Sequence, residues 1–271
     1  MKLEQHTVAL SSGTVTYHMA GEGKPVLYLH GGGGFRFTGT LRALAKVFRV
    51  YAPVTPGFDG TPILHDVASM PELAKLWGEF ADRVIERRCD LIGHSFGGWL
   101  AAWFAVLLPE RLGRLVLEAP SGFCQGAPAA PKDLEALRRA LMVHPEKASL
   151  ETKPPELLAR NREIMGHYHR EGTEPDAGRV MFGDNDTALS DRLAEVDAPT
   201  LILYGTKDGA VRLESVQFVE QRIRHAFLIY VDDAAHAMEI DQPEQVAVLV
   251  TDFLIRGEAA KRYHSESTNR D

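Results

Sequence analysis

Six short runs rich in apolar residues, separated by longer segments, constrain the fold of this chain more than any other feature. Runs that lack an alternating polar face are typical of strands buried on both sides of a sheet. Helical patterns lie between most of them, and this alternation predicts an α/β fold with a mostly parallel sheet covered on both faces. The runs are residues 25–29, 48–52, 90–92, 115–117, 200–204 and 227–231, and residues 7–10 and 14–19 add a predicted hairpin before them.

The final helix of this pattern has clear start and stop signals. It is expected over residues 242–255, with Asp241 as its N-cap and Pro243 in its first turn. Gly257 is expected to end it, because glycine readily adopts the left-handed conformation that terminates helices. The polar residues 258–271 that follow are expected to form a disordered tail.

Residues 121–191 interrupt the alternation of strands and helices. They contain no strand-like run, but they do contain three helical patterns joined by proline-rich segments. We therefore expect a core made of residues 1–120 and 192–257, with a helical insertion placed over one end of the sheet. The three patterns cover residues 134–142, 156–169 and 187–196.

The segment Gly93-His-Ser-Phe-Gly97 is the strongest chemical signal in the chain, because it follows a short strand and opens an apolar helix. A serine at the apex of such a tight turn has a strained backbone, and only small residues fit two positions to either side of it. The turn exposes the hydroxyl at the carboxyl edge of the sheet. Ser95 is therefore predicted to be a nucleophile.

A serine hydroxyl needs a base, and that base needs a carboxylate to fix its tautomer. Among 11 histidines, His236 follows the last predicted strand and precedes the last helix, at the same sheet edge as Ser95. Asp208 also follows a strand at that edge, and the order Ser95, Asp208, His236 is the one used by this kind of site. Glu118, which ends the preceding strand, is the weaker alternative for the acid.

A glycine run supplies the remaining part of the predicted site. His30-Gly-Gly-Gly-Gly34 directly follows a strand, so its bare backbone can approach a substrate closely. We expect the amides of Gly32 and Phe96 to form the oxyanion hole, with Gly33 adjacent. A phosphate-binding loop is the competing interpretation, but no Gly-Lys-Ser/Thr follows and the dinucleotide spacing is absent.

Composition narrows the possible partners. The net charge of −7 leaves no excess basic surface for a nucleic acid or an anionic membrane. The start of the chain lacks the apolar stretch of a signal peptide, and no segment reaches the length of a membrane span. Cys89 and Cys124 form neither a disulfide framework nor a metal motif. A cytoplasmic protein that acts on a small molecule, without cofactor or metal, is expected; its oligomeric state is left open.

Together these motifs make residues 7–256 resemble the α/β-hydrolase superfamily. The resemblance implies an eight-stranded, mostly parallel sheet flanked by helices, with residues 121–191 as a helical cap over the active site. Val54 stands where the family usually has an aspartate with a structural role. Cap side chains that could shape the pocket are Phe123, Leu137, Met142, Met165, Tyr168, Met181 and Phe182.

A serine at the nucleophile position limits the reactions expected within that superfamily. Haloalkane dehalogenases and epoxide hydrolases of this fold use aspartate at the position of Ser95, which argues against both. Carbon–carbon hydrolases of ring-cleavage products share the glycine loop and the cap, but commonly have tryptophan where this chain has Ala237. Hormone-sensitive-lipase-like esterases share the glycine loop but usually have Asp-Ser-Ala in the elbow. The expected function is hydrolysis of a small ester or lactone through an acyl-enzyme on Ser95.

Two further hypotheses stay open. The same three residues could support carbon–carbon bond hydrolysis or lyase chemistry. The fold and site could also form a small-molecule receptor with little or no turnover, because a fold alone does not define a function.

Overall fold

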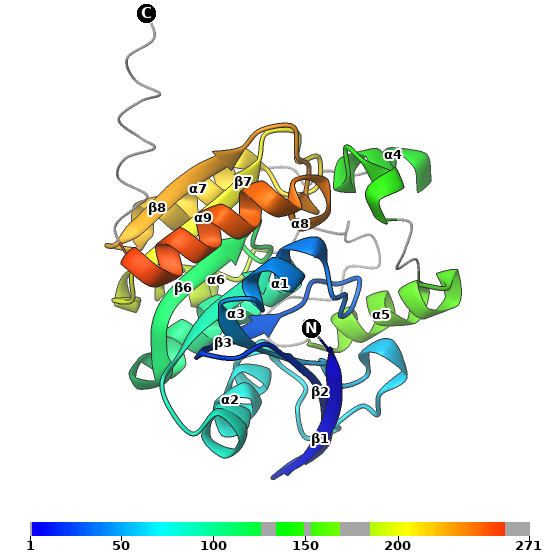
Figure 1. The fold of residues 1–271 in the computed structure, drawn as a ribbon, viewed down its shortest axis with the longest axis vertical. Coiled ribbons are helices and arrows are strands. Elements are labelled where there is room, and N and C mark those ends of the chain that lie inside the picture. Colours follow the sequence, from blue (N-terminus) through cyan, green and yellow to red (C-terminus); the bar gives the residue numbers. More distant parts are fainter. Residues whose placement is uncertain (1, 126–133, 149–152, 169–184, 258–271) are drawn as a thin grey trace, which may run out of the picture.

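The core of the protein is one eight-stranded sheet. We describe residues 2–125, 134–148, 153–168 and 185–257 of a computed structural model (Figure 1). The strand order is β1-β2-β4-β3-β5-β6-β7-β8, and all neighbours are parallel except β1–β2 and β2–β4. The strands are β1 (Glu4–Leu10), β2 (Gly13–Ala20), β3 (Lys24–Leu29), β4 (Phe48–Pro53), β5 (Cys89–His94), β6 (Leu112–Glu118), β7 (Thr200–Gly205) and β8 (Ala226–Val231).

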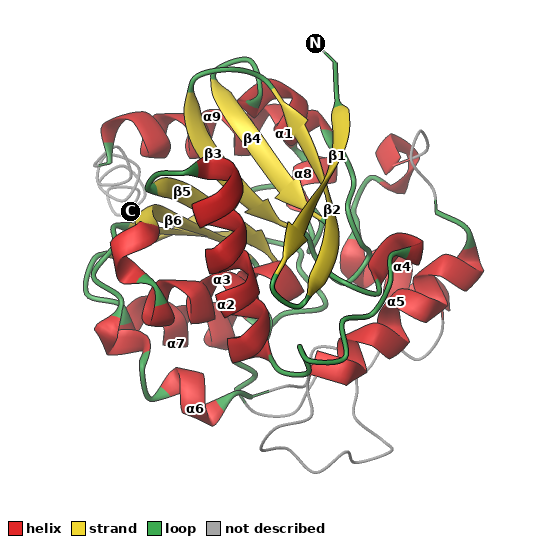
Figure 2. Cartoon of the chain, turned by 90° about the horizontal axis from the view of Figure 1, so that it is seen from below, coloured by secondary structure: helices red, strands yellow, loops and turns green. Residues whose placement is uncertain are grey.

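Helices cover both faces of this sheet, as predicted from the alternation of patterns. α1 (Gly39–Leu44) and α9 (Pro243–Arg256) pack against each other on one face. On the other face lie α2 (Met70–Phe80), α3 (Phe96–Leu107) and α7 (Leu213–Arg222) (Figure 2). None of the described helices is both long and apolar enough to cross a membrane.

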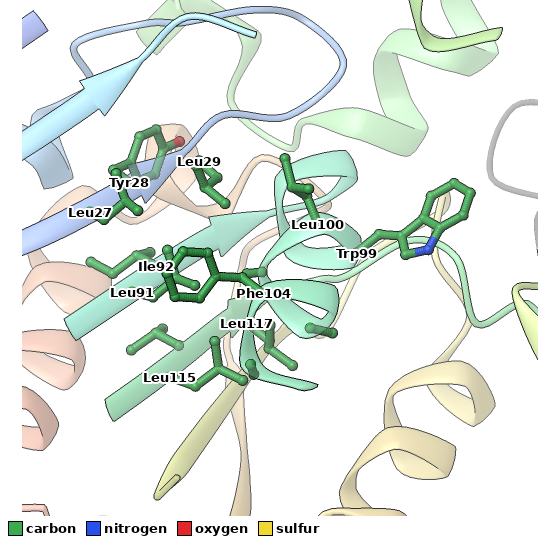
Figure 3. Close-up of a cluster of buried hydrophobic side chains, with 14 of the residues drawn as sticks. Leu27, Tyr28, Leu29, Leu91, Ile92, Trp99, Leu100, Phe104, Leu115 and Leu117 are labelled. Carbon is green, nitrogen blue, oxygen red and sulfur yellow. The ribbon is translucent and has the colours of Figure 1, made fainter. Parts of the chain in front are cut away.

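The helix that follows Ser95 is buried almost all round. Leu100 and Phe104 of α3 lie against side chains of β3, β5 and β6, whereas the indole of Trp99 points away from them (Figure 3). Residues such as Leu91 and Leu115 have no exposed surface. Burial of this apolar surface anchors the start of α3, and with it Ser95, to the carboxyl edge of the sheet.

The ends of two helices need comment. α2 ends as an α-helix at Phe80, and the chain continues as a π-helical turn, Ala81–Ile85. The N-cap of α9 is Gln242 rather than Asp241, which belongs to the short helix α8 (Met238–Asp241). The expected stop is confirmed: Gly257 has φ 74° and its N–H donates to the carbonyl of Phe253.

The insertion contains α4 (Leu134–Leu141), α5 (Pro155–Tyr168) and α6 (Thr187–Ser190). α4 and α5 lie on the same side of the molecule in both views (Figures 1 and 2). The third predicted helix is shorter than expected, because a separate 3-10 turn, Leu193–Glu195, follows α6. Other 3-10 turns are Phe58–Gly60, Pro109–Arg111 and Pro145–Ala148. The predicted tail, residues 258–271, lies outside the described residues.

Candidate active site

Ser95 occupies the strained turn that the sequence predicts. Its φ of 54° and ψ of −115° lie outside the ordinary regions for a residue with a side chain. A Cβ on Gly93 would overlap the carbonyl oxygen of Gly97, and a Cβ on Gly97 would overlap that of Leu29. The turn is held by its backbone: the Ser95 N–H donates to the carbonyl of Glu118 at 2.9 Å. Close packing therefore requires both glycines.

Three strand ends bring Ser95, His236 and Asp208 into one hydrogen-bonded chain. His236 Nε2 lies 2.8 Å from Ser95 Oγ, and His236 Nδ1 lies 3.0 Å from Asp208 Oδ2. A carboxylate can only accept, so the ring proton is on Nδ1 and Nε2 can accept the serine proton. Ser95 and His236 are buried, at 5% and 3% exposure, which strengthens these polar contacts.

The carboxylate of Asp208 is held by the start of the next segment. Its Oδ1 accepts N–H bonds from Ala210 at 2.8 Å and Val211 at 2.9 Å, leaving Oδ2 for His236. The alternative acid, Glu118, is buried, and neither of its carboxyl oxygens has a hydrogen-bond partner among the described residues. Burial, followed by the charge of Glu239, raises the pKa of Glu118 well above its usual range. Asp208 is thus the carboxylate that contacts the histidine.

Two other histidines support loops around the site. His30 Nδ1 donates to the carbonyl of Gly31, and its Nε2 accepts the N–H of Thr55 at 3.0 Å. Burial lowers the pKa of His30 to about 4, consistent with this neutral tautomer. His94 Nε2 donates to the carbonyl of His236 at 3.0 Å, and burial also lowers its pKa. Both residues therefore hold backbone groups of the loops around the site.

The glycine loop lies directly beside the elbow. The N–H of Gly34 donates to the carbonyl of Gly31 at 3.0 Å, which closes a tight turn. A Cβ on Gly31 would lie 3.3 Å from the Cβ of Ser95, so the loop and the nucleophile are in close contact. The side chain of Met165, from α5, packs onto Gly32. The glycine loop, predicted to contribute to the oxyanion hole, therefore lies next to Ser95, and Met165 covers Gly32.

α5 crosses the site and is fastened to the core by Asp59. Lys153 Nζ donates to Asp59 Oδ1 at 2.6 Å, and Asn161 Nδ2 donates to the same oxygen at 3.1 Å. Burial alone would raise the pKa of Asp59, but hydrogen bonds from Lys153 and Asn161 and the nearby charges lower it. Tyr168, at the end of α5, donates its hydroxyl proton to the carbonyl of Pro56. These contacts hold the helix over the nucleophile.

Aromatic rings form a buried apolar cluster that includes Phe96, the residue after the nucleophile. Phe96 lies 5.7 Å from Phe58 and 6.2 Å from Tyr168, measured between ring centroids. Among the expected pocket residues, Tyr168 belongs to this cluster and Met165 covers Gly32. Phe123 and Leu137 are buried, whereas Met181 and Phe182 lie outside the described residues.

Some polar residues around the site were not found from the sequence. Asp186 accepts both indole N–H groups of Trp99 and Trp103, at 2.8 and 2.7 Å. The two tryptophans are four residues apart on α3 and so share a face, a spacing that could have suggested a common partner. Asp59 has φ 53°, but its role depends on contacts more than 90 residues away, which no local pattern indicates.

The fold and this constellation together define an α/β hydrolase. The chain belongs to the Alpha/beta hydrolase family, whose profile it matches over residues 26–249, and it is therefore a hydrolytic enzyme.

Among curated proteins, it is 27% identical over 258 residues to the pimeloyl-[acyl-carrier protein] methyl ester esterase of Aeromonas hydrophila, covering 89% of this chain and 99% of that protein. It is 28% identical to the 2-hydroxy-6-oxo-6-phenylhexa-2,4-dienoate hydrolase of Comamonas testosteroni, covering 90% and 92%. The meta-cleavage product hydrolase of Pseudomonas fluorescens IP01 has a similar fold, with a TM-score of 0.73 at 24% identity and coverage of 93% and 98%.

Proposed function

We propose that this enzyme hydrolyses a carboxylic ester or lactone of a small organic substrate, with Ser95 as nucleophile, His236 as base and Asp208 as the supporting acid. The observation that carries this proposal is the continuous hydrogen-bonded chain from Ser95 Oγ through His236 to Asp208. The esterase activity in the name of the Aeromonas relative supports the same reaction class.

In the proposed mechanism, His236 Nε2 takes the proton of Ser95 as Oγ attacks the substrate carbonyl. The resulting oxyanion is stabilised by the amides of Gly32 and Phe96. The protonated histidine then gives its proton to the leaving alcohol, and the acyl group stays on Ser95. A water molecule activated by the same histidine releases the acid and restores the serine. No metal or organic cofactor takes part in these steps.

The residues around the nucleophile favour a small, largely apolar acyl group. Phe58, Phe96, Tyr168 and Met165 surround the region beside Ser95 with apolar surface. We propose that the inserted helices form a cap whose α5 shapes this pocket. The expectation of a small-molecule substrate in the cytoplasm, without a nucleic acid or membrane partner, continues to rest on the charge and composition of the chain.

Carbon–carbon bond hydrolysis is the second candidate, with the same three residues. It is favoured by the 28% identity to a dienoate hydrolase over nearly the whole chain. Activity on a ring-fission dienoate, together with inactivity on short-chain esters and lactones, would select this candidate over the first.

The Ser95→Ala variant tests the proposal. Wild-type protein should hydrolyse short aryl esters and react with a fluorophosphonate at Ser95, and the variant should lose both properties. The expected loss of turnover is about 10⁴-fold or more, because the residue makes the covalent bond. Ester turnover that persists in a correctly folded variant would show that Ser95 is not the nucleophile.

A further inference from the structure

Asp241 is a fully buried carboxylate that the predicted role as a helix cap does not explain. Its oxygens accept the backbone N–H groups of Val143 and His144 from the insertion, at 3.0 and 2.8 Å. Oδ2 also accepts the N–H of Ala235 at 2.8 Å. Ala235 immediately precedes His236, so one side chain joins the inserted helices to the histidine loop.

The same part of the insertion contacts the acid loop as well. We call residues 140–147, which span the end of α4 and the turn after it, the α4 clasp. The carbonyl of Ala140 accepts the N–H of Gly209 at 3.1 Å, one residue after Asp208. The carbonyl of Leu141 accepts the N–H of Ala237 at 2.8 Å, one residue after His236. Both loops that contribute to the proposed triad are therefore bonded to the α4 clasp.

Side chains reinforce these backbone contacts. Lys147 Nζ donates to the backbone carbonyl of Asp241. The His144 ring lies 2.7 Å from Asp233 Oδ2, and Lys207 Nζ donates to Asp233 Oδ1 at 2.6 Å. These charged groups are partly exposed and contribute little individually. The buried Asp241 carboxylate, with three N–H donors, is the strong part of the arrangement because charge-assisted hydrogen bonds strengthen in a low dielectric.

We propose that the α4 clasp is part of the catalytic framework, and that Asp241 is a positioning residue that holds the Asp208 and His236 loops in register. This inference rests on the proposed function of Ser95, His236 and Asp208. The insertion then acts through two of its described parts: α5 faces the substrate, and the α4 clasp sets the geometry of the acid and the base. Loosening the α4 clasp should lower the rate of hydrolysis of every substrate, including substrates too small to touch the insertion. The reason is that misplacing a catalytic group by about 1 Å can reduce a rate by about 100-fold.

Gly209 offers a way to disturb the α4 clasp without touching the reacting groups. A Cβ on Gly209 would lie 2.9 Å from Ala140 Cα and 3.0 Å from Ala140 Cβ, so Gly209→Ala must push the end of α4 away. Gly166→Ala is the matched control, since a Cβ there meets nothing within 4 Å. It adds the same methyl group to the insertion, but on α5 rather than at the contact with the α4 clasp.

With 4-nitrophenyl acetate as the smallest ester, Gly209→Ala is expected to lower kcat at least 10-fold and to change KM less than about 3-fold. Gly166→Ala should match wild type. In an Asp208→Asn background the same Gly209→Ala change should alter the residual kcat by less than about 3-fold, because His236 then carries its proton on Nε2 and no longer acts as the base, whatever the position of its loop. An equal loss in both backgrounds, or a change in KM alone, would overturn the proposal.

A measurement that needs no substrate separates this proposal from the proposed function. The proton resonance of His236 Nδ1–H, observed in histidine-labelled protein by NMR, reports the hydrogen bond to Asp208 even if no ester is cleaved. It should be present in wild type and Gly166→Ala, and shifted or lost in Gly209→Ala. An unchanged resonance in Gly209→Ala would refute the role of the α4 clasp. An inactive wild type with the expected resonance changes would refute only the esterase assignment.

Asp241→Asn provides a second variant if Gly209→Ala does not fold. The asparagine side chain has only one acceptor oxygen, and its NH₂ group cannot accept, so it cannot bind all three N–H donors that Asp241 binds. The same loss of kcat and of the His236 resonance is therefore expected. Asp252→Asn, on the outer part of α9, is its control. A folded Asp241→Asn protein with wild-type kcat and resonance would contradict the proposal.

Discussion

Replacing Asp208 by asparagine should inactivate the enzyme by forcing His236 into the wrong tautomer. The amides of Ala210 and Val211 both donate to Asp208 Oδ1. In Asp208→Asn the amide oxygen must take that place, because an NH₂ group there would face two N–H donors. The NH₂ group is then directed at His236 Nδ1, which must accept, so the ring proton moves to Nε2.

The size of the effect follows from this geometry. With a proton on Nε2, 2.8 Å from Ser95 Oγ, the imidazole donates to the serine and cannot take its proton. Loss of the general base and of its supporting charge in such a triad lowers kcat by about 10⁴-fold. This corresponds to about 5.5 kcal/mol of activation free energy. The volume of the side chain is unchanged, so binding of substrate should be nearly unaffected.

The assay is steady-state hydrolysis of a short aryl ester, with kcat and KM measured separately and folding checked by thermal unfolding. Glu214→Gln is the control, because Glu214 lies close to Asp208 in sequence but pairs with Arg212 at the surface. If folded Asp208→Asn kept more than about a tenth of the wild-type kcat, the tautomer argument would be refuted.

Two further predictions concern α5 and the buried acid Glu118. Met165→Ala removes the thioether that packs on Gly32. The kcat/KM for esters with a branched acyl group should then rise several-fold relative to kcat/KM for the acetate ester. If that ratio is unchanged, Met165 does not limit the size of the acyl group. Burial and Glu239 raise the pKa of Glu118, so the folded protein retains a proton that the unfolded chain loses, and stability falls as the pH rises above the usual glutamic acid pKa. Glu118→Gln, which cannot ionise, should therefore gain thermal stability over wild type as the pH rises above the usual glutamic acid pKa. A difference in Tm that does not grow with pH would contradict this.

Much of the core could be predicted because its signals are local. The buried strands, the all-apolar helix α3 and the glycines around Ser95 each depend on residues within one turn or one strand. The sequence alone leaves a choice between Asp208 and Glu118 as the acid, since both lie at or just beyond strand ends on the same edge of the sheet. The structure separates them: Asp208 lies three residues beyond the end of β7, where its side chain reaches His236, whereas Glu118 is the last residue of β6 and its carboxyl oxygens have no hydrogen-bond partner among the described residues.

Hydrophobic periodicity and the steric needs of a tight turn act over a few residues, so the alternation of strands and helices and the strained turn at Ser95 can be derived from the sequence. The same holds for the order of the three proposed catalytic residues along the chain. That Asp241 holds the insertion rather than capping α9, and that Asp59 fastens α5, is known only from the packed structure. Those contacts join residues about 100 positions apart, and they depend on how packed elements meet rather than on the pattern within any one of them.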